Sequence, residues 1–386
     1  LLAEFGLDID VSMPVDSLPI SSRQIVEIAK ALSLNARVLL LDEPTSALAP
    51  DEVDALFDVL RGLAAKGIGI VYVSHHMAEI FRISDRVTVL RDGQQISTLP
   101  VSETSQERVI AEMIGGAHPG DINRSGDVKG AEVLNVKGLT RASEFEDISF
   151  SIKSGEIVGM AGLMGARRSE IVRSIVGLMQ GVTGEVALHG KPAKFTSLRQ
   201  AMRAGVGFVP EERKTEGLFL EQSLSDNLIA ASLPEHTTLG IMSKGSIRRA
   251  STAAIAAFSV KAGEITEEVG SLSGGNQQKI MLAKWLKRAP DLLIVEEPTK
   301  GVDVGAKFQI HTELLRRAAE GMAILVVSSD FPELVSLSTR ILVVHEGRLM
   351  GDIAAHEASE AALLQMAAGN PNPPLISPSP HSGAAL

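Results

Sequence analysis

The chain has 386 residues, enough for two or three domains of ordinary size, and its 45% hydrophobic and 22% charged residues are typical of globular proteins. A net charge of −10 argues against broad binding to nucleic acid or to anionic membrane, and the absence of cysteine excludes disulfides and thiolate metal sites. Because no run of about 18 apolar residues and no secretory signal occurs, we expect the chain to stay in the cytosol.

The first element with chemical content is an apolar strand predicted at residues 38–41, which Asp42 and Glu43 follow directly. Carboxylates at this end of a buried strand lie where open α/β sheets bind nucleotides. There Asp42 would hold magnesium through water, and Glu43 would polarise the attacking water as a general base. Taken alone, the pattern is better explained by a strand that ends in a solvated acidic turn.

An internal repeat organises the chain. The acidic strand around Asp42 recurs around Glu296, a shift of 254 residues (296 − 42), and the same shift relates Ser74 to Ser328 and Gly93 to Gly347. One register held over this length indicates two copies of one domain rather than a short-period solenoid.

The repeat also predicts the domain boundaries. We assign residues 1–117 to the C-terminal part of a first domain, 118–130 to a polar linker, 131–371 to a second domain and 372–386 to a disordered Pro- and Ser-rich tail. Since 131 − 254 is −123, the first copy should begin about 120 residues before Leu1. We therefore interpret the chain as truncated at its N-terminus.

In the second copy, a glycine loop lies between an apolar strand at 156–161 and a helix from 169 onward. Gly162, Gly165, Arg168 and Ser169 fit the frame of a phosphate-binding loop, although Arg168 replaces the usual lysine and Arg167 replaces a glycine. Backbone N–H groups of such a loop face a polyanion, Arg168 would grip phosphate, and Ser169 would be a magnesium ligand. An ordinary Gly-rich turn is the alternative for the isolated match.

Ser273, Gly274 and Gly275 precede a helical pattern at 279–289, which places them at a helix N-terminus, a favourable place for an anion. A simple helix cap with a flexible lead-in is the alternative. The spacing favours function, because Leu272 lies 20 residues before the acidic strand (292 − 272) and its copy Leu18 does the same (38 − 18).

The second acidic strand ends in Glu296 and Glu297. Glu296 is one methylene longer than the aspartate of the first copy, a displacement comparable to the roughly 1 Å that can cost about a hundredfold in rate. We therefore predict that this second site is impaired. Apolar runs at 292–295 and 323–327, separated by an amphipathic stretch at 306–321, predict an α/β domain with a mostly parallel sheet.

This order of motifs resembles the ABC-type ATPases, which have the P-loop NTPase fold. The segments LSGGNQQK, VPEERKTEGL and EEPTKGVDVGAK closely resemble the second half of the tandem ATPases of monosaccharide importers of the ribose, xylose and galactose type. The resemblance covers nearly the whole chain apart from the linker and the tail. It implies two tandem copies of the fold, the first incomplete, with ATP and Mg²⁺ as cofactors.

In that family the two domains pair head to tail, so that each ATP lies between the phosphate loop of one domain and the LSGG segment of the other. The first site would combine the phosphate loop of the first copy, expected in the missing segment before Leu1, with Asp42, Glu43 and His75. His75 would contact the γ-phosphate. The segment that closes this site consists of Ser273, Gly274, Gly275 and Asn276.

The second site would be degraded, because Pro19 stands in its closing segment where the family has serine and Ser329 replaces the switch histidine. We expect it to bind nucleotide weakly or structurally. The residues implied for it are Gly162, Gly165, Arg168, Ser169, Glu211, Glu296 and Glu297, with Ser169 and Glu296 at the metal and Glu297 at the catalytic position.

The resemblance implies a bacterial ATPase subunit that energises import of a simple sugar. Its partners would be membrane permease subunits and, indirectly, a sugar-binding protein outside the membrane, with no nucleic acid. It would act as a peripheral protein at the cytoplasmic face of the inner membrane. The alternatives are a non-catalytic nucleotide-binding remnant and a tandem ABC ATPase that acts on ribosomes.

Overall fold

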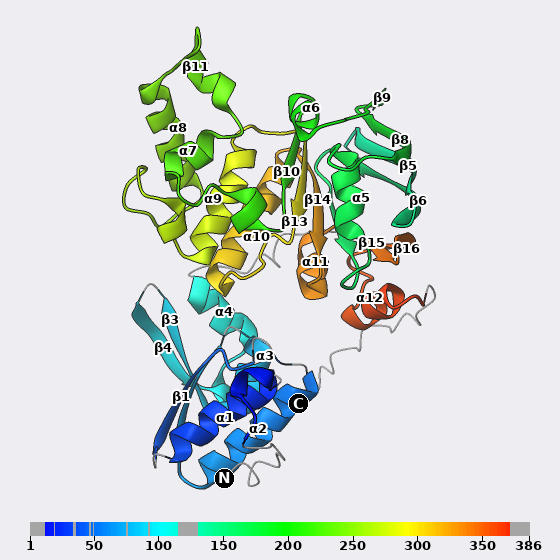
Figure 1. Ribbon diagram of the computed structural model, residues 1–386. Helices are drawn as coiled ribbons and strands as arrows, with labels where there is room; N and C mark the ends of the chain where they lie inside the picture. The colour runs from blue at the N-terminus through cyan, green and yellow to red at the C-terminus, as the bar shows by residue number, and fades with distance from the viewer. Residues whose placement is uncertain are drawn as a thin grey trace, which may run out of the picture. The chain divides into compact units, whose positions relative to one another are not determined.

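The computed structural model describes residues 12–18, 20–33, 36–45, 48, 50–74, 76–91, 93–114 and 130–370 (Figure 1). The expectations for Pro19, for His75, for residues 118–129 of the linker and for the tail lie outside these residues. The chain divides into two compact units, Leu1–His118 and Pro119–Leu386, and each is described by itself.

The first unit has four α-helices and four strands among its described residues. Strand β1 (Val38–Asp42) pairs in parallel with β2 (Gly69–Val73), and β3 (Arg86–Arg91) pairs antiparallel with β4 (Gln94–Pro100). The core of the β1–β2 half forms around Leu56, Phe57 and Leu60 of α2, whose spacing puts them on one face of the helix. The helices are α1 (Ile20–Ser33), α2 (Pro50–Ala65), α3 (Met77–Ile83) and α4 (Gln106–Ile114).

The second unit contains a six-stranded sheet in the order β10-β13-β14-β7-β15-β16, parallel except for the last pair. Its central strands are completely buried, as their continuous apolar sequences require. The strands are β7 (Ile157–Ala161), β10 (Val206–Val209), β13 (Leu292–Glu296), β14 (Ala323–Ser328), β15 (Arg340–His345) and β16 (Arg348–Ala354).

Helices surround this sheet, and a second, antiparallel sheet packs beside it (Figure 1). The antiparallel sheet has the order β6-β5-β8-β9, with β5 (Glu132–Arg141), β6 (Phe145–Lys153), β8 (Val182–Leu188) and β9 (Lys191–Pro192). A small hairpin joins β11 (Thr237–Thr238) to β12 (Ile241–Met242). The helices are α5 (Arg168–Ile175), α6 (Leu198–Arg203), α7 (Leu224–Ile229), α8 (Lys244–Ala257), α9 (Gly274–Leu286), α10 (Val304–Ala319), α11 (Phe331–Leu337) and α12 (Glu360–Ala367).

The described elements repeat with the register that the sequence predicts. Each α-helix and β-strand of the first unit starts 254 residues before a counterpart in the second, from α1 and α9 (274 − 20) to α4 and α12 (360 − 106). Even the irregularity in the β3–β4 ladder recurs between β15 and β16. The predicted fold class, an α/β fold in two tandem copies of which the first is incomplete, is therefore confirmed.

The incompleteness of the first copy is visible in its exposed apolar residues. Leu40 is 76% exposed, whereas its counterpart Ile294 is completely buried. In the second unit β7 joins β14 to β15. There α5 and the antiparallel sheet pack against the side of the parallel sheet on which Ile294 lies. Among the described residues of the first unit, no strand joins β2 to β3. The first unit thus corresponds to the second unit from about Val269 onward.

Candidate functional site

The glycine loop of the second unit connects β7 to α5, as the sequence predicts. A Cβ at Gly162 would lie 2.7 Å from the carbonyl oxygen of Val344, and Gly165 has a φ of +84°. Both glycines are therefore required by the backbone. The loop brings the N-terminus of α5, with its exposed N–H groups and positive dipole end, to the carboxyl edge of the parallel sheet.

Arg167 adopts the left-handed conformation, with φ 75° and ψ 20°, directly before α5. This geometry suits the glycine that the loop frame has there, and it costs a residue with a side chain roughly 1–2 kcal/mol. The side chain is half exposed and forms an ion pair with Glu170 at 3.0 Å. The structure thus keeps the loop backbone at the expense of strain at Arg167.

Arg167→Gly is expected to increase the affinity of the chain for ATP by about three- to tenfold, because glycine adopts this conformation freely and opens the loop backbone to phosphate. Ser143→Gly is the matched control, since Ser143 also has a positive φ of 67° but lies in the β5–β6 turn. Both variants should raise the free energy of unfolding by at most about 1 kcal/mol, and only Arg167→Gly should change binding. Equilibrium dialysis with ATP makes the comparison, and an unchanged or weaker affinity in Arg167→Gly contradicts the prediction.

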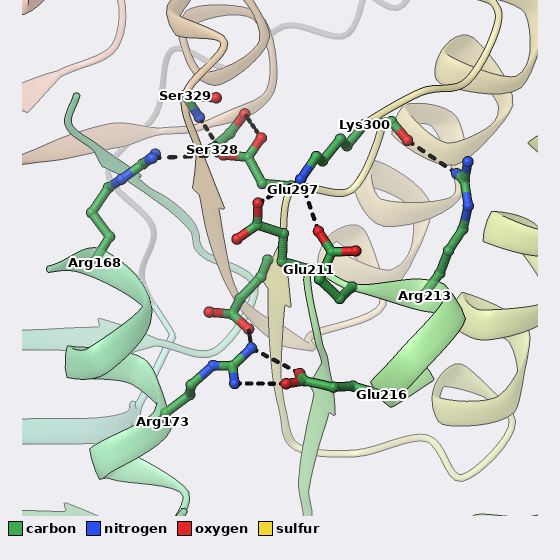
Figure 2. Close-up of polar contacts among 11 residues, drawn as sticks. Arg168, Arg173, Glu211, Arg213, Glu216, Glu297, Lys300, Ser328 and Ser329 are labelled. Carbon is green, nitrogen blue, oxygen red and sulfur yellow. Dashed lines mark hydrogen bonds and ion pairs between the residues drawn. The ribbon is translucent and has the colours of Figure 1, made fainter. Parts of the chain in front are cut away.

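Arg168 extends from the first turn of α5 toward the carboxylate of Glu297, with 3.7 Å between Nη2 and Oε1 (Figure 2). Its side chain is only 12% exposed, and its Nη1 has no hydrogen-bond partner within the described part of the chain. Burial lowers the pKa of Arg168, and the carboxylates of Glu297, Glu211 and Glu296 oppose that shift. A buried guanidinium with an unused N–H is suited to a phosphate oxygen.

Glu297 follows β13 in a left-handed conformation with a φ of 44°, and its backbone N–H donates to the carbonyl of Val327 at 2.7 Å. Its carboxylate accepts hydrogen bonds from the N–H of Ser329 at 2.8 Å and from the hydroxyl of Ser328 at 3.3 Å (Figure 2). Burial raises the pKa of Glu297, and the charge of Arg168 acts against this rise. The carboxylate is therefore held by its own domain.

Glu296 is the last residue of β13 and is almost completely buried, at 1% exposure. Its Oε2 accepts from Nη2 of Arg173 at 3.1 Å, whereas its Oε1 has no hydrogen-bond partner among the described residues. Nη1 and Nη2 of Arg173 also donate to the carboxylate of Glu216, at 3.1 and 2.8 Å (Figure 2). Burial raises the pKa of Glu296, and Ser169 and Arg173 counteract that shift.

Arg173 is a site residue that the sequence reasoning missed. It lies four residues after Ser169 on α5, one helical turn along the same face, so the spacing of a loop serine and a later arginine was the available signal. Its two partners are 43 and 123 residues away in the sequence, and only the fold brings them together.

Glu211 lies beyond the end of β10 and forms an ion pair with Lys300 at 2.8 Å, and Glu212 contacts the same ammonium group at 3.0 Å. Arg213 donates to the carbonyl of Lys300 at 3.1 Å (Figure 2). The segment after β10 is thereby tied to the loop after β13, and Glu211 is held beside the pocket described below.

The LSGG segment, residues 272–275, leads into α9, and Ser273 is the N-cap residue of that helix. The Ser273 side chain makes no capping hydrogen bond to the helix backbone, and its hydroxyl accepts from Nδ2 of Asn276 at 3.0 Å instead. A Cβ at Gly274 would lie 3.0 Å from the carbonyl of Gly301, and one at Gly275 would lie 2.8 Å from Cβ of Ala306. Close packing therefore requires these glycines, while the helix end they form still presents N–H groups to an anion.

A single open pocket of about 930 Å³ gathers the residues of the second unit's site, a size that suits a small organic ligand. It combines the glycine loop and α5 with the ends of β13 and β14. Its polar lining includes Arg168, Ser169, Arg173, Glu211, Glu297 and Lys300. The structure thus brings together most of the residues predicted for the second site.

In the first unit, Asp42 ends β1 and Glu43 follows it with a φ of 45°, nearly the value at Glu297. The N–H of Glu43 donates to the carbonyl of Val73 at 2.8 Å, which reproduces the bond between Glu297 and Val327. The two units therefore share one backbone conformation at the acidic turn, although Asp42 of the first unit corresponds to Glu296 of the second.

Fold and site together define an ATP-binding cassette. Residues 145–300 match the family model described as ABC transporter. The ADP conformation of MJ1267, an ATP-binding cassette of an ABC transporter, has a TM-score of 0.53 and 16% identity, and the match covers 62% of this chain and 99% of that one. This likeness shows the fold, which is the P-loop NTPase fold of ABC cassettes.

Similarity to longer proteins narrows the family. The chain is 43% identical to the ribose import ATP-binding protein RbsA of Halalkalibacterium halodurans, and the match covers 95% of this chain and 74% of that protein. It is 40% identical to the putative ribose/galactose/methyl galactoside import ATP-binding protein of Geobacillus kaustophilus, over 96% of this chain and 73% of that one. The chain belongs to this family of ABC importer ATPase subunits, as the resemblance predicted.

None of the helices in the described residues combines the length and the apolar character that a membrane span requires.

Proposed function

We propose that this chain hydrolyses ATP to energise the import of a simple sugar through membrane permease subunits, which receive the sugar from a binding protein outside the membrane. The observation that carries the proposal is the 40–43% identity, over nearly the whole chain, to proteins named for ribose or galactoside import. The chain would act at the cytoplasmic face of the membrane, where both the permease and ATP are accessible to it. Nucleic acid is not a partner, in keeping with the net charge of −10.

The proposed chemistry differs between the units. In the first, Asp42 would hold Mg²⁺ bound to the nucleotide, and Glu43 would accept a proton from the attacking water. His75, outside the described residues, would contact the γ-phosphate. Mg²⁺ supplies charge neutralisation at the phosphates, and a single exposed carboxylate such as Asp42 suits an ion that keeps most of its water ligands.

In the second unit, Gly162, Gly165, Arg168 and Ser169 would bind the phosphates, and Glu211 would line the nucleotide site. Supporting this role, the loop geometry and the buried guanidinium of Arg168 face the same pocket. Ser273, Gly274, Gly275 and Asn276 would bind phosphate at the N-terminus of α9. Glu297 is engaged by Arg168 and Ser329, so we propose that it contributes little to hydrolysis.

ATPase assays test the proposal. The rate is measured for this chain and for the same chain joined to the phosphate-loop segment of the H. halodurans relative, each with and without the cognate permease in lipid nanodiscs. We expect hydrolysis to require the joined segment and to be stimulated when permease, binding protein and sugar are present. Hydrolysis of equal rate in both chains, indifferent to the permease, would argue for an activity unrelated to transport.

A further inference from the structure

The side chain of Arg173 lies where a nucleotide-bound metal ion would meet the second unit. In P-loop proteins the ion is held between the hydroxyl of the loop Ser/Thr and the acidic residue at the end of a neighbouring strand. Here those groups are Ser169 and Glu296. Arg173, one turn after Ser169, donates to Glu296 at 3.1 Å. A guanidinium thus occupies Oε2, one of the two oxygens of the carboxylate that the metal would use, while Oε1 has no hydrogen-bond partner among the described residues.

This arrangement does not fit a divalent cation. A guanidinium offers only donors and keeps its charge at all accessible pH values, so it cannot coordinate a metal and repels one. Glu216 also holds the guanidinium of Arg173 in place, because its carboxylate accepts two hydrogen bonds from it.

The same side chains suit a polyphosphate. Nε of Arg173 and Nη1 of Arg168 are buried, and neither finds a hydrogen-bond partner in the described part of the chain. Both residues line the pocket beside the glycine loop. Buried unpaired donors destabilise the folded chain, more so when they are charged, and a phosphate oxygen would satisfy them with charge-assisted hydrogen bonds. The site therefore carries two guanidinium groups, those of Arg168 and Arg173, each with a buried N–H that could donate to an anion.

We propose that the second unit binds a nucleoside triphosphate without a divalent metal ion, with the guanidinium of Arg173 in the place of the ion. The inference rests on the proposed nucleotide binding by the glycine loop and departs from the expectation that Ser169 and Glu296 hold Mg²⁺. It also explains why a glutamate is tolerated at the end of β13, since the longer side chain reaches a guanidinium and needs no coordination geometry. The unit holds its nucleotide as a structural ligand whose binding does not follow Mg²⁺.

Binding of ATP to the 386-residue chain is measured by equilibrium dialysis, in excess Mg²⁺ and in excess EDTA. The sequence contains one phosphate-loop frame, at Gly162–Ser169, so binding reports this unit. A second readout is the shift of the urea midpoint by ATP, followed by the fluorescence of the single tryptophan, Trp285 on α9. We expect the affinities in the two media to agree within about threefold.

Arg173→Ala should reduce binding in EDTA by at least about tenfold and should make binding respond to Mg²⁺, because Glu296 is then released. Glu216→Gln keeps the guanidinium and should bind equally in both media. Arg316→Ala, whose ion pairs with Glu313 and Glu320 lie on α10, is the matched control and should bind as the parent chain does.

A loss of more than about tenfold in EDTA for the parent chain overturns the metal-free inference and leaves the nucleotide site standing. Absence of ATP binding in both media overturns the inference together with the proposed nucleotide site. If Arg173→Ala does not fold, the parent chain and Glu216→Gln still decide the question, since each must bind ATP equally in both media.

Discussion

Glu43→Gln is expected to lower ATP hydrolysis by at least about 100-fold in the chain joined to a phosphate-loop segment, since general-base catalysis contributes about 10²–10⁴-fold. Glutamine keeps the size and much of the hydrogen bonding of glutamate but cannot accept the proton. Its backbone should keep the same conformation, because the N–H bond to Val73 and the positive φ do not depend on the carboxylate.

The repeat supplies the matched control for this prediction. Glu297 lies at the equivalent position with nearly the same φ, and Glu297→Gln should leave the hydrolysis rate within about threefold of the parent. Steady-state phosphate release measures both variants. A large loss in Glu297→Gln with little effect in Glu43→Gln would move the chemistry to the second unit and reject the assignment of unequal sites.

Glu333→Ala is expected to destabilise the second unit by about 3–5 kcal/mol, the range for removal of one partner from a buried charged network. Glu333 is almost fully buried and accepts hydrogen bonds from Thr299 at 2.6 Å, His311 at 2.8 Å and Ser328 at 2.7 Å. Without the carboxylate, these donors lose their acceptor in the core. Urea denaturation followed by Trp285 fluorescence measures the change.

Two comparisons sharpen this test. Glu320→Ala removes a half-exposed carboxylate from α10's C-terminal end and should change the unfolding free energy by less than about 0.5 kcal/mol. Glu333→Gln removes only the charge and should have an intermediate effect. A destabilisation by Glu333→Ala as small as that of Glu320→Ala would show that the network contributes little to stability.

The charge at Glu333 also gives a pH dependence. Burial alone would raise the pKa of Glu333, but the hydrogen bond and charge of His311, with Lys307 and Thr299, bring it below its ordinary value of 4.5. Because the folded-state pKa is the lower one, the stabilisation is complete above pH 4.5 and is lost as pH falls through the folded-state pKa. The stability difference between the parent chain and Glu333→Gln should therefore shrink as the solution is acidified below pH 4.5.

The sequence predicted the fold wherever a local pattern coincided with the repeat. The acidic strands, the glycine loop and the helix after Ser273 lie where periodicity placed them. The antiparallel sheet formed by β5, β6, β8 and β9 was not predicted, because its strands are held by pairings whose registers are interrupted by bulges and carry no distinctive motif. Local patterns therefore identified the parallel sheet, and the remaining layer needed the structure.

The site was predicted by residue type better than by contact. The sequence identified Arg168 and Glu296 as members of the site, and the structure places both beside the loop. It gave no indication that Arg173 binds Glu296, or that Lys300 pairs with Glu211, because these partners are 123 and 89 residues apart.

The position of β7 in the centre of its sheet has a consequence for folding. Ile157 of β7 pairs with Ile324 of β14, and Val158 pairs with Arg340 of β15, so both neighbours of the loop-bearing strand come from much later in the chain. Contacts of such long sequence separation slow folding, since loop-closure entropy must be overcome before they stabilise anything. During synthesis, one edge of the strand that carries the phosphate loop stays unpaired until residues near 328 have left the ribosome, and the other edge until residues near 343 have done so. The loop that follows β7 can therefore adopt its folded conformation only after β14 and β15 have been synthesised.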